Sequence, residues 1–114
     1  MRAKKAISRA DELRPNTISE EQKSAWLNDL DGQLAEQFGL PAPKDKFPED
    51  FDLLMPHPHE EIYQLYLICK IDYYNQDFTL YANDASVYAQ ALDEARAWYR
   101  RHHRPEKAGG WKVM

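Results

Sequence analysis

The sequence has few of the residues that build cross-linked or metal-stabilised folds, since its 114 residues include one cysteine, Cys69. A single cysteine excludes an internal disulfide framework and a multi-cysteine zinc site. The four glycines do not form a phosphate-binding loop, and the patterns G-x-x-x-x-G-K-[ST], G-x-G-x-x-G and G-x-S-x-G are all absent. No apolar run approaches the roughly 18 residues that cross a bilayer, and the basic N-terminus lacks the apolar part of a secretory signal. We therefore expect a soluble intracellular protein.

The charges that are present are unevenly distributed along the chain. Residues 1–14 carry a net charge of +3, residues 15–95 carry −12 and residues 96–114 carry +5, within a total of −4. The 43% hydrophobic content is typical of a single globular domain. An acidic body between two basic ends suits head-to-tail contacts between copies, or termini that reach an acidic partner. A solvated acidic surface with ordinary basic tails is the alternative interpretation.

The first predicted helix covers residues 20–37. Ser19 followed by Gln22 forms a capping box, and Gly39 is a typical residue just beyond a helix end. The apolar residues between them recur at spacings of three and four, which is the period of one helix face. These residues are Trp26, Leu27, Leu30, Leu34 and Phe38.

Two further helices, over 59–75 and 78–102, are predicted to form a long antiparallel pair. The first is apolar on nearly every side, which is typical of a helix at the centre of a bundle or one buried by a partner. A turn at Asn75–Asp77 separates the two, with Asp77 as the cap of the second. Five prolines in residues 39–58 predict an irregular arm, with room for a short strand near 51–55.

The predicted fold class is therefore all-α, a small helical bundle. It comprises a basic N-terminal extension (1–18), a helical domain (19–102) that includes the proline-rich arm, and an extended C-terminal tail (103–114).

The residues that could take part in metal binding or catalysis are better explained as ordinary surface or core residues. His57 and His59 flank a proline and lack the spacing of known metal sites, and nothing in the sequence brings His102 and His103 to them. Cys69 lies on the apolar stripe of its helix, which favours a core residue over a reactive thiol. Carboxylate pairs such as Asp29/Asp31 and Asp50/Asp52 are expected by chance in so acidic a segment. We expect no catalytic residue, no cofactor and no metal site.

Several longer runs of residues do form a recognisable pattern over residues 11–104. They are Asp11-Glu12-Leu13-Arg14-Pro15-Asn16, Ser19-Glu20-Glu21, Lys23, Trp26-Leu27, Leu30-Asp31-Gly32, Pro56, Glu60-Glu61-Ile62-Tyr63, Tyr66-Leu67, Lys70-Ile71-Asp72-Tyr73-Tyr74-Asn75, Tyr81-Ala82-Asn83-Asp84 and Trp98-Tyr99-Arg100-Arg101-His102. In these runs the chain resembles a family of small structural proteins of tailed phages and prophages, the head–tail connectors (adaptors, or head-completion proteins).

The resemblance implies a non-enzymatic virion protein at the portal vertex, or neck, made in the host cytoplasm. Such proteins form rings, commonly dodecamers, whose partners are neighbouring copies, the portal protein and a tail-side neck or tail-terminator protein. The genome passes through the lumen of the ring, and no membrane is involved. The basic extension at residues 1–10 and the long tail depart from the family pattern.

The basic C-terminal end is the candidate contact surface of such a subunit. Tryptophan and arginine are the residue types most enriched at binding hot spots. We expect the contact with the portal or a neighbouring copy to use Arg100, Arg101, Arg104, Lys107, Trp111 and Lys112. The alternative function is a small regulatory or nucleic-acid-binding helical protein that uses the Arg100–Arg104 cluster, although the acidic body would repel phosphates.

Overall fold

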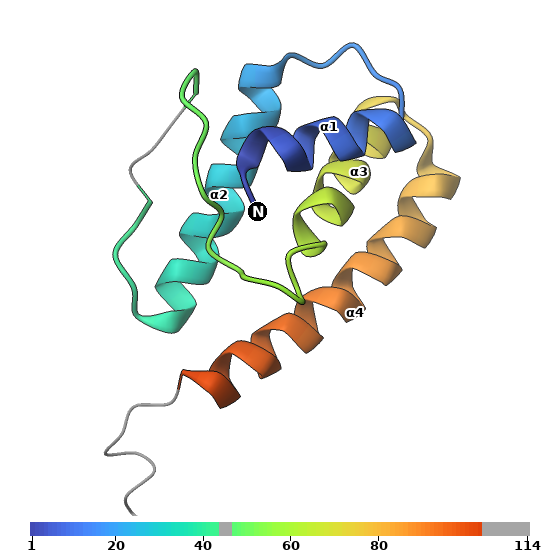
Figure 1. The fold of residues 1–114 in the computed structure, drawn as a ribbon. Helices are drawn as coiled ribbons and strands as arrows, with labels where there is room; N and C mark the ends of the chain where they lie inside the picture. Colours follow the sequence, from blue (N-terminus) through green and yellow to red (C-terminus); the bar gives the residue numbers. More distant parts are fainter. Residues whose placement is uncertain (44–46, 104–114) are drawn as a thin grey trace, which may run out of the picture.

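The computed structural model describes residues 1–43 and 47–103, which form four helices around one core (Figure 1). The helices are α1 (Ala3–Leu13), α2 (Glu20–Phe38), α3 (Ile62–Tyr74) and α4 (Phe78–His102). α1 lies across α2 and α3, and α4 packs along α3 (Figure 1). The predicted all-α class is confirmed. In place of the short strand considered near 51–55, the described residues hold only an isolated bridge between Arg2 and Asp52.

α2 begins and ends where local sequence signals place it. The Ser19 side chain accepts a hydrogen bond from the Gln22 backbone N–H at 3.1 Å, and Gly39 closes the helix with a left-handed φ of 71°. Leu27, Leu30 and Leu34 are completely or almost completely buried. Burying each such leucine stabilises the fold by about 1.5–3 kcal/mol.

α3 occupies the centre of the bundle, as its apolar composition predicts. Its side chains at Ile62, Tyr63, Leu67 and Ile71 are fully buried. α3 begins at residue 62 rather than 59 because the preceding residues form turns, in which the His59 N–H donates to the Pro56 carbonyl at 3.0 Å. The backbone groups before residue 62 are thus used in a non-helical conformation.

The turn between α3 and α4 follows the prediction. Gln76 has a positive φ of 60°, and the Asp77 carboxylate caps α4 by accepting from the Leu80 N–H at 3.2 Å. The aromatic residues beside this turn are not covered by the chain, however. Tyr73 is 60% exposed and Tyr74 is 64% exposed, although the helical period places both among the apolar residues of α3.

The structure differs from the sequence prediction most at residues 1–18, where α1 stands in place of a basic extension. Ala3, Ala6, Ile7 and Ala10 repeat at helical spacing and are all buried. Three of these four residues are alanines, which contribute little to a hydrophobic pattern but allow α1 to approach its neighbours closely. Lys4, Lys5 and Arg9 project from the exposed side of α1, although the helix belongs to the core.

The described part of the proline-rich segment runs against α1 and α2. Phe51, Leu53 and Met55 are buried. The Phe51 carbonyl accepts from the Ala3 N–H at 2.8 Å, which joins this segment to the start of α1. Among the residues that the structure describes, no helix has the length and apolar character needed to span a bilayer.

Candidate interaction surfaces

The predicted contact residues fall into two groups in the structure. Arg100 and Arg101 are exposed on the last turn of α4, where the helix dipole favours cations. The other predicted contacts, Arg104, Lys107, Trp111 and Lys112, lie outside the described residues, as does most of the predicted tail. The basic turn formed by Arg100 and Arg101 is therefore the described part of this candidate surface.

Aromatic stacking holds the basic turn in place. The His102 ring stacks on Trp98 with 4.5 Å between centroids, and the His103 ring stacks on Tyr99 at 3.9 Å. Tyr99 stacks in turn on Phe38 of α2 at 4.0 Å. The last turn of α4 thus presents its arginines from a fixed position.

Three of the four histidines, His59, His102 and His103, pack around Trp98 at this end of the molecule, which sequence reasoning did not foresee. His59 and His102 both pack on Trp98, the former with 5.4 Å between centroids. The Nδ1 atom of His102 lies 2.8 Å from the Trp98 carbonyl oxygen, which can only accept, so this nitrogen carries the proton. Within residues 1–43 and 47–103, no group of three or more His, Cys, Asp and Glu side chains is placed to hold a metal ion.

Cys69 is a core residue, as the sequence predicts. It is buried, and burial raises the pKa of its thiol to about 11, assisted by the negative charges of Asp84 and Asp72. The thiol is therefore protonated at neutral pH and is a poor nucleophile.

Three of the four carboxylates singled out in the sequence have structural partners, since Asp50 and Asp52 both bond to Arg2 and Asp31 is held in the core. Asp31 is buried, and its two oxygens accept from the Tyr63 hydroxyl at 2.6 Å and the Leu54 N–H at 2.9 Å. The Met55 N–H donates to the Tyr63 oxygen at 2.7 Å. Burial is the main reason that the pKa of Asp31 is raised. This cluster joins α2, α3 and the proline-rich segment.

A second polar cluster, which sequence reasoning missed, joins α1 to the α3–α4 pair. Arg14 follows α1, and its guanidinium donates to Asp72 of α3 at 2.8 Å and to Asp84 of α4 at 2.6 Å. The Asp72 side chain is 1% exposed, and its Oδ2 atom accepts from no donor within the described residues. The sequence signal was an aspartate inside the apolar run of α3, because a buried charge requires a counter-ion.

Asp72 and Asp84 titrate as a coupled pair. Burial, with a hydrogen bond to Asp84, raises the pKa of Asp72 to about 6, whereas the same hydrogen bond lowers the pKa of Asp84. One proton shared between the two carboxyl groups explains the opposite directions.

This pair predicts a specific pH dependence of stability. Because the folded state holds the Asp72 proton more tightly than the unfolded chain does, the free energy of unfolding should rise as pH falls from 7.5 to 5, by about 1 kcal/mol. The Asp72→Asn variant, which resembles the protonated carboxyl, should lose this contribution. Urea unfolding at several pH values measures both. A pH response in this window that is identical in the two proteins would contradict the assignment.

The bundle surface also carries a groove, here called the tyrosine groove, lined by Tyr66, Cys69, Lys70, Tyr73, Tyr81 and Tyr88. Its volume is about 350 Å³. The tyrosines pack in pairs, Tyr66 with Tyr88 and Tyr73 with Tyr81, each at 5.4 Å between ring centroids. Burial raises the pKa values of Tyr66 and Tyr88, so both phenols are neutral at physiological pH.

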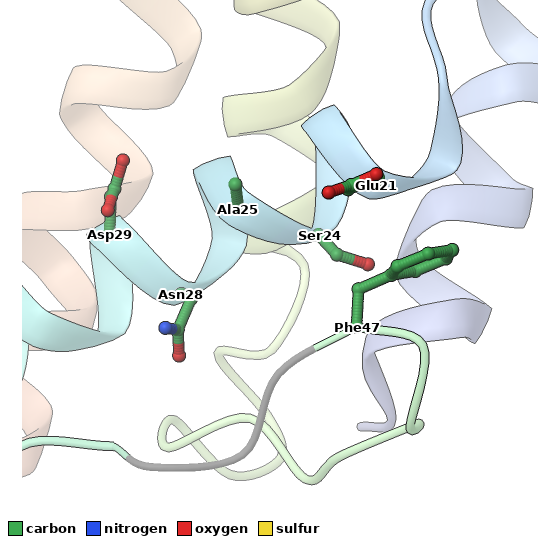
Figure 2. Close-up of a pocket in the computed structure, with 6 residues that line it drawn as sticks. All are labelled: Glu21, Ser24, Ala25, Asn28, Asp29 and Phe47. Carbon is green, nitrogen blue, oxygen red and sulfur yellow. The ribbon is translucent and has the colours of Figure 1, made fainter.

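A smaller cavity of about 290 Å³ lies where the proline-rich segment meets α2. Figure 2 shows the Phe47 ring beside Ser24 and Glu21 of α2, with Asn28 and Asp29 about one turn beyond Ser24. The cavity contains no pair of groups arranged as a nucleophile with a base among its labelled residues. We assign no chemistry to it.

Comparison with known proteins adds no relative, because no family model, curated protein or solved structure matches the chain.

Proposed function

We propose that this chain is a structural subunit of a tailed phage or prophage, a head–tail connector that forms a ring beneath the portal. Its partners are the portal, neighbouring copies and a tail-side neck or tail-terminator protein, and the genome passes through the lumen. The proposal assigns it no enzymatic activity and places it in the virion after assembly in the host cytoplasm.

One observation carries the proposal: the residues that make the chain resemble this family also form its contacts between helices. Several polar residues in the family-like runs bond to another helix or loop, and these include Asp11, Arg14, Asn16, Lys23, Asp31, Glu60, Tyr63, Asp72 and Asp84. A pattern made of such contacts specifies an arrangement of helices rather than a reaction. This is what a purely structural family requires.

The contact of Lys23 illustrates the point. Its side chain is 5% exposed, and its Nζ atom donates to Asp11 at 2.7 Å and to Asn16 at 3.1 Å. A buried lysine needs such partners to remain charged. The three residues join α1, the following loop and α2, and all three belong to the family-like runs.

The proposal is tested by removing the gene from the phage or prophage that encodes it. We expect DNA-filled heads and free tails that do not join, seen by electron microscopy, and recovery of infectious particles when the purified protein is added. Particles that join normally without the protein would refute the connector function.

The exposure of Arg100 and Arg101 favours the alternative, nucleic-acid binding, as a second candidate. It would require an affinity for duplex DNA that falls steeply with salt, by a slope of about −0.9 per phosphate contact. Fluorescence anisotropy with the wild-type chain and the Arg100→Glu/Arg101→Glu variant measures this. A salt-dependent affinity that the double substitution abolishes would favour this candidate over the connector.

The C-terminal residues provide a further prediction of the connector proposal. Residues 103–114 carry a net charge of +2 and one large aromatic, Trp111. We expect deletion of 105–114 to change the melting temperature by less than about 2 °C, since the last residues of a chain generally add little to stability. The same deletion should abolish attachment to portal-bearing heads.

The Trp111→Ala substitution in the full chain distinguishes the contribution of the Trp111 side chain from that of the tail as a whole. It should reduce attachment nearly as much as the deletion does, as expected for a hot-spot residue. If the truncated protein attaches and completes particles as well as the full chain, the tail has no role in assembly.

A further inference from the structure

The exposed aromatic residues of this bundle are concentrated at one end. Tyr73, Tyr74 and Phe78 are each more than half exposed, and all three lie within one turn of the α3–α4 connection. Tyr73 packs edge-on against both Phe78 and Tyr81, so the ring positions are set by mutual contact. Large apolar groups left exposed together mark an interaction surface. The tyrosine groove begins at this patch.

The aromatic rings of the groove are suited to bind a cation. Lys70 of the same chain already holds its ammonium 5.5 Å from the Tyr66 ring centre and 5.8 Å from that of Trp26, within the range of cation–π attraction. A guanidinium group stacks on such rings better than an ammonium does. The other part of the groove, toward Tyr73 and Tyr81, offers the same kind of aromatic ring. Within the described residues, no cation of the same chain lies over these two rings.

The surroundings of the groove are acidic. Asp29 lies near Tyr66, and Asp77 caps α4 beside the exposed aromatics. Tyr66 and Lys70 also line an adjoining hollow that includes Asp29 and Glu36. A basic segment would therefore be attracted to the groove, whereas a nucleic acid would be repelled.

The chain presents such a basic segment at the other end of the same helix. Arg100 and Arg101 lie 12 and 13 residues beyond Tyr88, the groove residue nearest to them in α4. At 1.5 Å per residue, about 18 Å of continuous helix separates the arginines from the groove. The basic turn of one molecule therefore cannot reach its own groove. It can reach the groove of another copy.

We propose that the tyrosine groove binds the basic turn, Arg100 and Arg101, of a second copy of this chain. The contact is heterologous, because it joins two different surfaces, so each subunit has one surface of each kind left for a further neighbour. Such a contact closes into a ring or continues as a filament. The choice of a ring over a filament rests on the proposed function. The contact itself does not, because it requires no portal or head.

The test uses two variants of the full chain that each remove one surface. Tyr73→Ser/Tyr81→Ser alters the groove, and Arg100→Glu/Arg101→Glu reverses the charge of the basic turn. Sedimentation velocity should show concentration-dependent association of the wild-type chain, which each variant reduces by at least about tenfold in association constant. A mixture of the two variants should form a one-to-one complex and nothing larger, because each supplies the surface that the other lacks.

Matched controls have the same kind of substitution elsewhere on the surface. Leu80→Ser/Val87→Ser removes two exposed apolar side chains of α4 that do not line the groove. Lys5→Glu/Arg9→Glu reverses two exposed charges on α1. Both should associate as the wild type does, and circular dichroism should show unchanged helix content in every variant.

Three results would overturn the inference. The first is a wild-type chain that stays monomeric at ~1 mM, a concentration at which even weak association is measurable. The second is a groove variant that associates as the wild type does. The third is a mixture of the two variants that does not form a complex. Association that persists in both variants would leave the connector function standing with a different interface. If the purified protein fails to restore head–tail joining but the two variants still form their one-to-one complex, the connector function is refuted and this contact remains supported.

Discussion

Replacing Arg14 with alanine should lower the free energy of unfolding by about 3–5 kcal/mol at pH 7.5, the typical cost of breaking a buried ion pair by removing one partner. Arg14 is the cation that faces both Asp72 and Asp84, and Asp72 is 1% exposed. Without the guanidinium, a buried carboxyl group and its neighbour share one site with no counter-charge. For a domain of this size the melting temperature should fall by roughly 10–20 °C.

The pH response of the Arg14→Ala variant distinguishes this explanation from lost packing. Since protonation neutralises the carboxyl pair, the destabilisation should shrink by at least about 1 kcal/mol between pH 7.5 and pH 5. Arg9→Ala is the matched control, because Arg9 is exposed on α1, and it should change stability by less than about 0.5 kcal/mol. A loss below about 1 kcal/mol for Arg14→Ala would show that the cluster is not the main tie between α1 and the α3–α4 pair.

The second large effect is expected at Asp31. Asp31→Ala leaves the Tyr63 hydroxyl without its acceptor and the Leu54 N–H without a partner, at a cost of about 1–3 kcal/mol for each group. We expect a total loss of about 2–5 kcal/mol in urea unfolding. The Asp31→Asn variant should lose less, because its amide oxygen can still accept from Tyr63 while its NH₂ group opposes the Leu54 N–H.

A double-mutant cycle measures the coupling directly. Tyr63→Phe should cost about 2–5 kcal/mol, because it leaves the Met55 N–H and one Asp31 oxygen unpaired. If the network acts as a unit, Asp31→Ala/Tyr63→Phe should lose at least about 0.5 kcal/mol less than the sum of the single losses. Additive losses would mean that the two side chains stabilise the fold independently.

The sequence by itself determined the three longer helices and their ends, apart from the start of α3, which lies at Ile62 and not at residue 59. Ser19, Gly39 and Asp77 act within a few residues of chain, so their capping roles follow from local chemistry. The core position of Cys69 followed from helical period in the same way. The absence of phosphate-binding and nucleophile motifs is likewise a property of the sequence, because such motifs are short and contiguous.

Only the tertiary structure decided what depends on residues far apart in the chain. α1 was missed because alanine is only weakly apolar, and its value as a core residue appears when a neighbouring helix lies close enough to use its small size. Arg14 meets Asp72 and Asp84 across separations of 58 and 70 residues, and Asp31 meets Tyr63 across 32. The tyrosine groove also depends on the tertiary structure. The spacing of Tyr73 and Tyr74 predicts an apolar helix, but the positions of α2 and α4 beside α3 determine which of its aromatic rings are covered.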